Sequence, residues 1–307
     1  MDTLDRRSLL RALAAIGAGA LVAPRTAAAQ ANPLLTRKIP RSGDALPLIG
    51  LGTWVVFNVG SDPVAREQRT RVLRDFFAAG GRLIDSSPMY GSSQEVIGHG
   101  LTRLGRPAAL FSADKVWTGS GPRGPAQIEA SRRAWTVPRF DLLQVHNLVA
   151  WKEHLPALLA MKAAGRVRYV GVTTSHGRRH DDLEVIMRSQ PLDFVQVTYN
   201  VVDREVEQRI LPLARERGIA VLINRPFQEG ALIRRLDQAA LPAWAGELDC
   251  TGWPQFLLKF IVSHPAVTCA IPATTNPAHV VENMGASRGR MPSEADRRRM
   301  IEYIRSV

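Results

Sequence analysis

Three titratable side chains end successive apolar runs in the first half of the sequence. These are Asp85, Lys115 and His146, at spacings of 115 − 85 = 30 and 146 − 115 = 31 residues. Such spacings are about the length of one βαβ repeat. Tyr90 lies in the proline-containing turn after Asp85. Because parallel barrel strands bring their carboxyl ends to one mouth, we expect a carboxylate, an ammonium, an imidazole and a phenol to meet there.

Carbonyl reduction is one reaction that such groups serve, because it needs a proton at oxygen as well as a hydride at carbon. A tyrosine hydroxyl is a poor acid at neutral pH because its ordinary pKa is about 10, and a neighbouring ammonium makes its proton easier to release. We predict that Tyr90 donates the proton and that Lys115, held by Asp85, activates it. His146 would hydrogen-bond the carbonyl oxygen. Taken singly, each side chain has a structural alternative, as a turn former, a packing residue or a solvated charge.

The elements that must position these residues alternate along the chain. Helical periodicity from 64 to 79 and from 151 to 164 stops at Gly80 and Gly165, as is typical of helix ends. Eight apolar strands separated by helical segments predict an α/β fold, a single closed (β/α)8 TIM barrel. The expected strands are 48–51, 83–85, 109–114, 141–145, 167–172, 194–197, 219–223 and 267–271.

The four residues, together with the first strand and turn at 48–54, resemble the catalytic tetrad and first strand of the aldo-keto reductases. The resemblance runs from about Lys38 to about Asn283. It implies reduction of an aldehyde or ketone to an alcohol, with hydride from NAD(P)H and the proton from Tyr90. The chain has no Gly-x-Gly-x-x-Gly fingerprint opening a βαβ unit, and aldo-keto reductases instead bind the dinucleotide across the barrel mouth.

The resemblance also assigns a cofactor site. Gln196 corresponds to the glutamine that holds the nicotinamide amide, and Asn224 takes the place of a ring that commonly stacks on nicotinamide. Thr173 and Thr174 stand where the family usually has Ser-Asn. The implied cofactor-binding residues are Gly52, Thr53, Trp54, Thr173, Thr174, Gln196, Asn224, Arg225, Phe227, Thr274, His279, Glu282 and Asn283.

The segment 271–283 resembles the adenosine-phosphate segment of the family. Thr274 fits a phosphate-binding hydroxyl, and a helix starting after Pro277 would add backbone N–H donors. The alternative is an ordinary helix started by proline. Ala273 and His279 stand where many members have lysine and arginine, so NADPH is the first expectation and NADH its competitor.

The substrate pocket is less clearly marked. Trp54 and Trp117 follow strand ends and would wall an apolar pocket, or else are core aromatics. The long connection 231–253 between the seventh and eighth strands is a candidate cover for cofactor or substrate. The sequence does not specify which carbonyl compound fits.

The first 29 residues resemble a twin-arginine export signal. Arg6-Arg7 precede an apolar run from 12 to 22, and Ala27-Ala28-Ala29 offers a small-residue cleavage site. The alternative is an amphipathic N-terminal helix. We predict a mature barrel of residues 30–307 that meets the twin-arginine export machinery and is periplasmic or exported. The apolar run is shorter than the about 20 residues that span a bilayer, so we expect no membrane span in the mature form.

The formal net charge is +12, and removing four arginines and two aspartates with residues 1–29 leaves 12 − 4 + 2 = +10. Paired arginines are scattered and no nucleic-acid motif lies between them, which indicates solvated helix faces and no specific nucleic acid. Cys250 and Cys269 belong to no metal cluster, and we predict no metal site. Cys269, in an apolar strand, is expected to be buried.

Three function classes therefore compete. The first is a reductase, favoured by the complete tetrad. The second is an exported cofactor-binding redox sensor or regulatory subunit with little turnover, to which the altered nicotinamide contacts lend weight. The third is a basic surface-binding protein, which requires salt-sensitive binding to nucleic acid or lipid.

Overall fold

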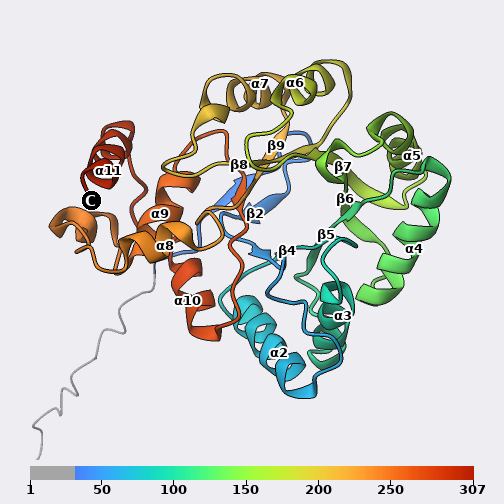
Figure 1. Cartoon of the computed structure of the whole chain (residues 1–307), viewed down its shortest axis with the longest axis horizontal. Coiled ribbons are helices and arrows are strands. Elements are labelled where there is room, and N and C mark those ends of the chain that lie inside the picture. Colours follow the sequence, from blue (N-terminus) through green and yellow to red (C-terminus); the bar gives the residue numbers. More distant parts are fainter. Residues whose placement is uncertain (1–31) are drawn as a thin grey trace, which may run out of the picture. The chain divides into compact units, whose positions relative to one another are not determined.

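A computed structural model describes residues 32–307, and the segment 1–29 with its predicted export signal lies outside the described residues. Eight parallel strands form one central sheet in which they are neighbours in sequence order, and helices surround this sheet (Figure 1). This arrangement confirms the predicted TIM barrel. The strands are β3 (Leu51–Gly52), β4 (Leu83–Asp85), β5 (Phe111–Val116), β6 (Phe140–Val145), β7 (Val167–Thr173), β8 (Phe194–Thr198), β9 (Ala220–Asn224) and β10 (Cys269–Ala270).

The barrel closes where its first and last strands meet. Parallel bridges join Ile49 to Ala270 and Gly52 to Ala273, and the Gly52 N–H donates to the Pro272 carbonyl at 2.9 Å. A Cβ at Gly52 would lie 2.7 Å from the carbonyl oxygen of Ile271, so only glycine permits this approach. The regular strands are shorter than the predicted runs 48–51 and 267–271 because single bridges complete the pairing.

The helices alternate with the strands as predicted. α2 begins after Asp62, whose carboxylate accepts the backbone N–H groups of Val64 and Ala65, and Gly80 follows its end with φ +91°, so both boundaries have a local cause. The helices are α2 (Pro63–Ala78), α3 (Ser93–Arg103), α4 (Gly124–Trp135), α5 (Trp151–Ala163), α6 (His180–Ser189), α7 (Ile210–Arg217), α8 (Ala231–Leu236), α9 (Trp253–Val262), α10 (Pro277–Gly285) and α11 (Glu294–Ser306), with short 3₁₀ turns η1 (Gly121–Arg123), η2 (His146–Leu148), η3 (Glu205–Glu207) and η4 (Ala243–Leu248).

Two apolar layers stabilise the barrel. The larger lies between the sheet and the helices, and the smaller fills the barrel interior. Within the interior, Phe111 stacks on Tyr169 with ring centroids 5.8 Å apart, and Phe194 packs against both rings. Strand residues alternate between the two faces. A rigid, filled barrel thus supports the strand ends at its mouth.

Two segments outside the predicted alternation complete the fold. A hairpin of β1 (Thr36–Lys38) and β2 (Ala45–Pro47) contributes Leu46 to the interior cluster. The C-terminal helix α11 lies beside α9 (Figure 1), where the Arg297 guanidinium bonds the Tyr199 hydroxyl and the Phe260 carbonyl. The chain therefore ends against the outer layer of the barrel.

Several basic side chains pair with acids on their own helices. Arg132 binds Glu129 at 2.7 Å on α4, and Arg298 binds Glu294 at 2.6 Å on α11. Cys250 and Cys269 are free thiols and both are buried. Within residues 32–307, no helix is long and apolar enough to cross a membrane, and no group of three or more His, Cys, Asp or Glu side chains is arranged to hold a metal ion.

Candidate active site

The structure brings the four predicted catalytic residues together at the carboxyl ends of β4, β5 and β6. Asp85 is the last residue of β4, Lys115 is one residue from the end of β5, and His146 follows β6 directly. Tyr90 lies in the turn between β4 and α3. Residues about 30 positions apart in sequence meet because neighbouring strands are parallel and in register.

Lys115 and Asp85 form a fully buried ion pair. The Lys115 Nζ lies 2.5 Å from Asp85 Oδ2 and 2.8 Å from the Ser86 carbonyl oxygen, which also accepts a hydrogen bond. Burial by itself lowers the pKa of Lys115, but the charge and hydrogen bond of the Asp85 carboxylate outweigh it, so the pKa is raised. The amine is therefore charged at neutral pH.

Two glutamines hold the second oxygen of Asp85. Gln196 Nε2 donates to Asp85 Oδ1 at 2.9 Å, and Gln144 Nε2 approaches the same atom at 3.4 Å. Gln144 stands beside Lys115 in the register of β5 and β6. A carboxylate that accepts from an ammonium and two amides is fixed in direction as well as in charge.

Tyr90 places its ring beside Lys115 and His146. Lys115 Nζ lies 5.3 Å from the centroid of the tyrosine ring. Burial raises the pKa of Tyr90, and the Lys115 ammonium opposes that shift without overcoming it. The expectation that the ammonium eases proton release is thus one of two competing effects. The net result keeps the phenol protonated, which a proton donor requires.

His146 is neutral in this setting. Its ring meets the Tyr90 ring edge-on with centroids 5.7 Å apart, and its Nδ1 lies 2.8 Å from the Ser87 hydroxyl oxygen. Burial, and secondarily the Lys115 ammonium, lowers the pKa of His146 to about 3. The imidazole therefore acts as a neutral hydrogen-bonding group and not as a cation at neutral pH.

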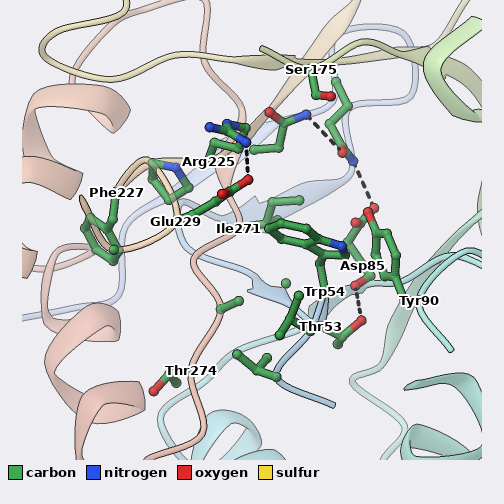
Figure 2. Close-up of a pocket in the computed structure, with 18 of the residues that line it drawn as sticks. Thr53, Trp54, Asp85, Tyr90, Ser175, Arg225, Phe227, Glu229, Ile271 and Thr274 are labelled. Atoms are coloured by element: carbon green, nitrogen blue, oxygen red, sulfur yellow. Dashed lines mark hydrogen bonds and ion pairs between the residues drawn. The ribbon is translucent and has the colours of Figure 1, made fainter. Parts of the chain in front are cut away.

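A cavity of about 920 Å³ extends from the tetrad across the barrel mouth. Figure 2 shows Asp85 and Tyr90 on one side of it, Arg225 and Glu229 across from them, and Thr274 at a distance from both. The predicted residues that line it are Gly52, Thr53, Trp54, Asp85, Tyr90, His146, Thr173, Gln196, Asn224, Arg225, Phe227, Thr274, His279, Glu282 and Asn283.

Three predicted residues do not line this cavity. Lys115 is fully buried. Thr174 donates its backbone N–H to the Gln196 carbonyl at 2.9 Å, and its buried hydroxyl has no partner within the described chain. Trp117 is 42% exposed, and its backbone bonds the Gln127 side chain at 2.7 and 2.8 Å. The cavity gives no support to Trp117 as a wall of the substrate pocket.

Asn224 occupies the place of the expected stacking ring but is held by hydrogen bonds. Its Nδ2 donates to the Thr174 carbonyl at 2.9 Å, and its Oδ1 accepts from the Thr198 hydroxyl at 2.7 Å. A longer contact of 3.4 Å joins its Nδ2 to Gln196 Oε1. Asn224 therefore presents a fixed amide to the cavity where an aromatic face was the family pattern.

A charged cluster crosses the mouth farther from the tetrad. The Arg225 guanidinium contacts the Glu229 carboxylate and His176 Nε2, and all three side chains line the cavity. Arg225 and Glu229 both have positive φ, +51° and +57°, a conformation that costs non-glycine residues energy. The cluster thus joins two irregular loops, after β7 and after β9.

The far end of the cavity is formed by the segment before α10. Asn276 caps this helix by accepting the Ala278 N–H at 3.0 Å, and the Thr274 hydroxyl accepts the Asn276 N–H at 3.1 Å. His279 Nδ1 lies 3.4 Å from the same hydroxyl. No lysine or arginine occurs in 271–283, so this end offers hydroxyl, imidazole and backbone N–H groups.

The connection 231–253 lies only partly at the cavity. Ile233 and Arg234 of α8 line it, as does Pro254 just beyond the connection. Trp244 and Trp253 instead pack on Phe256, with ring centroids 5.4 and 5.5 Å away. The predicted cover therefore contributes a wall through α8, while its tryptophans belong to the outer layer.

Sequence reasoning did not single out several polar residues of the site. Among them are Ser87, Gln144, His176 and Glu229, which contact the tetrad or Arg225. Ser87 and Gln144 could have been found from a weak sequence signal. Ser87 lies in the turn between Asp85 and Tyr90, and Gln144 precedes His146 by two positions. Glu229 and His176 lie in loops with no comparable signal.

The family model for the aldo/keto reductase family matches residues 48–298. The chain is 26% identical over 205 residues to the aldo-keto reductase YhdN of Bacillus subtilis, covering 62% of this chain and 61% of that relative's length. It is 24% identical over 247 residues to the NADH-specific methylglyoxal reductase of Escherichia coli, covering 68% and 73%.

Solved structures agree with this match. A Klebsiella pneumoniae aldo/keto reductase, determined in complex with NADP and acetate, superposes with a TM-score of 0.72 at 25% identity, covering 85% of this chain and 93% of that one. The chain belongs to the aldo/keto reductase family. The predicted enzyme class, an oxidoreductase of this family, is confirmed.

Proposed function

We propose that the protein reduces an aldehyde or ketone to an alcohol with a reduced nicotinamide dinucleotide. The observation that carries the proposal is the buried Lys115–Asp85 pair, 2.5 Å long, beside a protonated Tyr90 at the end of a large cavity. An acid must hold its proton before the reaction and release it as negative charge develops on the carbonyl oxygen. Burial secures the first condition and the Lys115 ammonium assists the second.

His146 and Tyr90 would bind the carbonyl oxygen from two sides. Their rings stand nearly perpendicular, at 84°, and both line the cavity. Hydrogen bonds aimed at the position where charge develops stabilise the transition state without reorganisation. Asp85 keeps the ammonium in place through Oδ2, while Gln196 and Gln144 hold its other oxygen.

The cavity residues fit a nicotinamide dinucleotide. Gln196 uses one N–H and one lone pair within the protein, which leaves one of each for a carboxamide. The unpartnered Thr174 hydroxyl lies next to this region. Thr274 and the first turn of α10 would hold a phosphate at the far end, with Glu282 and Asn283 toward the adenine. When bound, the cofactor supplies the hydride to the carbonyl carbon.

NADPH is the first choice of cofactor, by family resemblance and by the NADP in the Klebsiella pneumoniae structure. NADH remains the competing choice because Ala273 and His279 replace two cations and one relative is named as NADH-specific. Titration of cofactor fluorescence with both dinucleotides decides between them. An NADPH dissociation constant at least as low as that of NADH supports the first choice.

The test of the function is loss of reduced-cofactor absorbance with a panel of small aldehydes and ketones. The protein comprising residues 30–307 should oxidise the reduced cofactor with at least one of these carbonyl compounds. The Tyr90→Phe variant should have a kcat lower by about 10²- to 10⁴-fold, the usual contribution of a positioned acid. Tyr303→Phe, which removes a hydroxyl bonded to the Ala240 carbonyl on the outer layer, is the matched control. If the unsubstituted protein and the Tyr303→Phe control both bind the cofactor but reduce no carbonyl compound, the redox-sensor alternative is favoured.

We also propose that the protein is exported by the twin-arginine machinery. The support is the order of charged, apolar and small residues within 1–29. Fractionation of cells carrying the full chain should place a shortened protein outside the cytoplasm, and Arg6→Lys with Arg7→Lys should retain the full-length form inside. Unprocessed protein found only in the cytosol would contradict the proposal.

A further inference from the structure

The Ser87–His146 contact bears on which imidazole nitrogen carries the proton. The two residues are 59 positions apart in sequence, and the Ser87 Oγ lies 2.8 Å from His146 Nδ1. Ser87 is 0% exposed and His146 is 5% exposed. A buried hydroxyl and a buried ring nitrogen at this distance satisfy each other, as most buried polar groups in proteins do.

The hydrogen-bond count of Ser87 favours one arrangement. Its oxygen accepts the Met89 backbone N–H at 3.2 Å, which occupies one lone pair. The hydroxyl hydrogen then needs an acceptor, and His146 Nδ1 is the only one within hydrogen-bond distance in the described part of the chain. If Nδ1 carried a proton, the serine hydrogen would be buried without a partner, which costs the desolvation of an unsatisfied donor.

The second nitrogen of His146 then has a defined role. A neutral imidazole has one donor and one acceptor nitrogen, so an Nδ1 that accepts from Ser87 leaves the proton on Nε2. The His146 ring lines the cavity beside Tyr90, and its Nε2 makes no hydrogen bond within the described part of the chain. A donor at Nε2 matches a carbonyl oxygen, whereas a bare lone pair there would repel it.

We propose that Ser87 is a positioning residue that holds His146 as its Nε2–H tautomer, so that the imidazole donates to the substrate carbonyl oxygen. The consequence for substrate rests on the proposed carbonyl reduction. The tautomer itself does not depend on that reaction, because the serine hydroxyl fixes it in the free protein. These two parts are therefore testable apart.

Nitrogen NMR of the protein labelled with ¹⁵N-histidine, without cofactor or substrate, measures the tautomer directly. The chain has seven histidines, and His146→Gln identifies the signals of His146 by their disappearance. We expect an unprotonated Nδ1 and a protonated Nε2 at neutral pH. A protonated Nδ1 in the wild-type protein would overturn the proposal, whether or not the enzyme turns over any carbonyl.

Ser87→Ala and Ser86→Ala form a matched pair of variants. Both serines are fully buried in the same turn, but the Ser86 hydroxyl has no hydrogen-bond partner among residues 32–307. Ser87→Ala should shift the Nδ1 signal of His146, while Ser86→Ala should leave both nitrogen signals of that ring unchanged. Ser87→Thr, which keeps a hydroxyl, should restore the wild-type signals. Equal spectra for Ser87→Ala and wild type would refute the role of Ser87.

Turnover supplies the second readout. With a carbonyl substrate identified, Ser87→Ala should lower kcat about fivefold, the rate equivalent of one hydrogen bond of about 1 kcal/mol, with a smaller change in the dissociation constant of the cofactor. Ser87→Thr should recover most of kcat. A shifted Nδ1 signal with unchanged kcat, in an active enzyme, would overturn the link between the tautomer and carbonyl recognition.

Discussion

The two ends of the cavity are built on different supports. At the tetrad end, Asp85, Lys115 and His146 lie at the ends of strands, are buried, and have partners at 2.5–2.8 Å. The other end comprises the wall away from the tetrad, where Arg225 and Glu229 lie on a loop with positive φ and have partly exposed side chains. Side chains on strands of a filled barrel are held by packing on every side, whereas loop residues are held chiefly by each other.

The difference also appears in the match to the family pattern. The tetrad end carries the complete set of four residues, while Asn224, Ala273 and His279 replace residues common in the family at the dinucleotide site that the resemblance implies. Removing one partner of a buried pair leaves an unpaired charge, but an exposed pair is screened by water. We therefore expect substitutions at the two ends to differ in size and in kind.

The largest effect is expected from Lys115→Met, which leaves the Asp85 carboxylate buried without a cation. The free energy of unfolding should fall by about 3–5 kcal/mol, measured by urea denaturation, and turnover should be lost. Arg225→Met at the other end breaks a pair that is 19% and 39% exposed and should cost at most about 1 kcal/mol. Equal losses from the two variants would show that the ends are equally supported.

A double variant separates stability from chemistry at the tetrad end. Replacing both partners, with Lys115→Met and Asp85→Leu, removes the unpaired charge and should recover most of the lost stability, because apolar replacements of buried pairs are often tolerated. Turnover should stay absent. Recovery of turnover in the double variant would contradict the role given to Lys115.

The pH dependence of stability should be steeper at the tetrad end. The pKa of His146 is lowered from 6.5 to about 3 in the folded protein. As the pH falls, the imidazole is therefore protonated in the unfolded chain before it is protonated in the folded protein. The stability contributed by the neutral ring is present above pH 6.5 and is lost as pH falls toward 3. Between pH 7 and pH 4, the unfolding free energy of wild type relative to His146→Gln should fall by on the order of 3 kcal/mol.

His176→Gln is the control for that pH series. Burial, with Arg225 nearby, also lowers the pKa of His176, but its side chain is 43% exposed. Its contribution to the pH slope should therefore be much smaller. Parallel pH curves for wild type and His146→Gln would show that His146 ionises normally in the folded protein.

The smallest effect is expected from Glu229→Gln. Glu229 and His176 both contact the Arg225 guanidinium. The Glu229 carboxylate would repel a dinucleotide phosphate in the same cavity. Removing about 1 kcal/mol of repulsion should lower the dissociation constant of the cofactor about fivefold, measured by fluorescence titration. Glu216→Gln, on the exposed face of α7, should leave that constant unchanged. Weaker cofactor binding by Glu229→Gln would instead make the carboxylate a ligand.

Much of the fold could be predicted because barrel strands and helices carry strong local signals. The helix predicted at 151–164 is found at Trp151–Ala163, and the run 141–145 at Phe140–Val145. The hairpin at 36–47 was not predicted, since its strands of three residues each are too short to show a period. Such short strands form because they pair with each other in the folded protein, and this pairing leaves no periodic pattern in the local sequence.

The sequence by itself placed three of the four tetrad residues, because a spacing of one βαβ unit brings Asp85, Lys115 and His146 to the same end of adjacent strands. The position of Tyr90 depends also on the turn after β4. Only the tertiary structure decided what each of them touches. Contacts between Ser87 and His146, or between Gln196 and Asp85, join residues 59 and 111 positions apart. They depend on side-chain direction and on burial, and burial, which outweighs the Lys115 charge at Tyr90, is a property of the packed barrel alone.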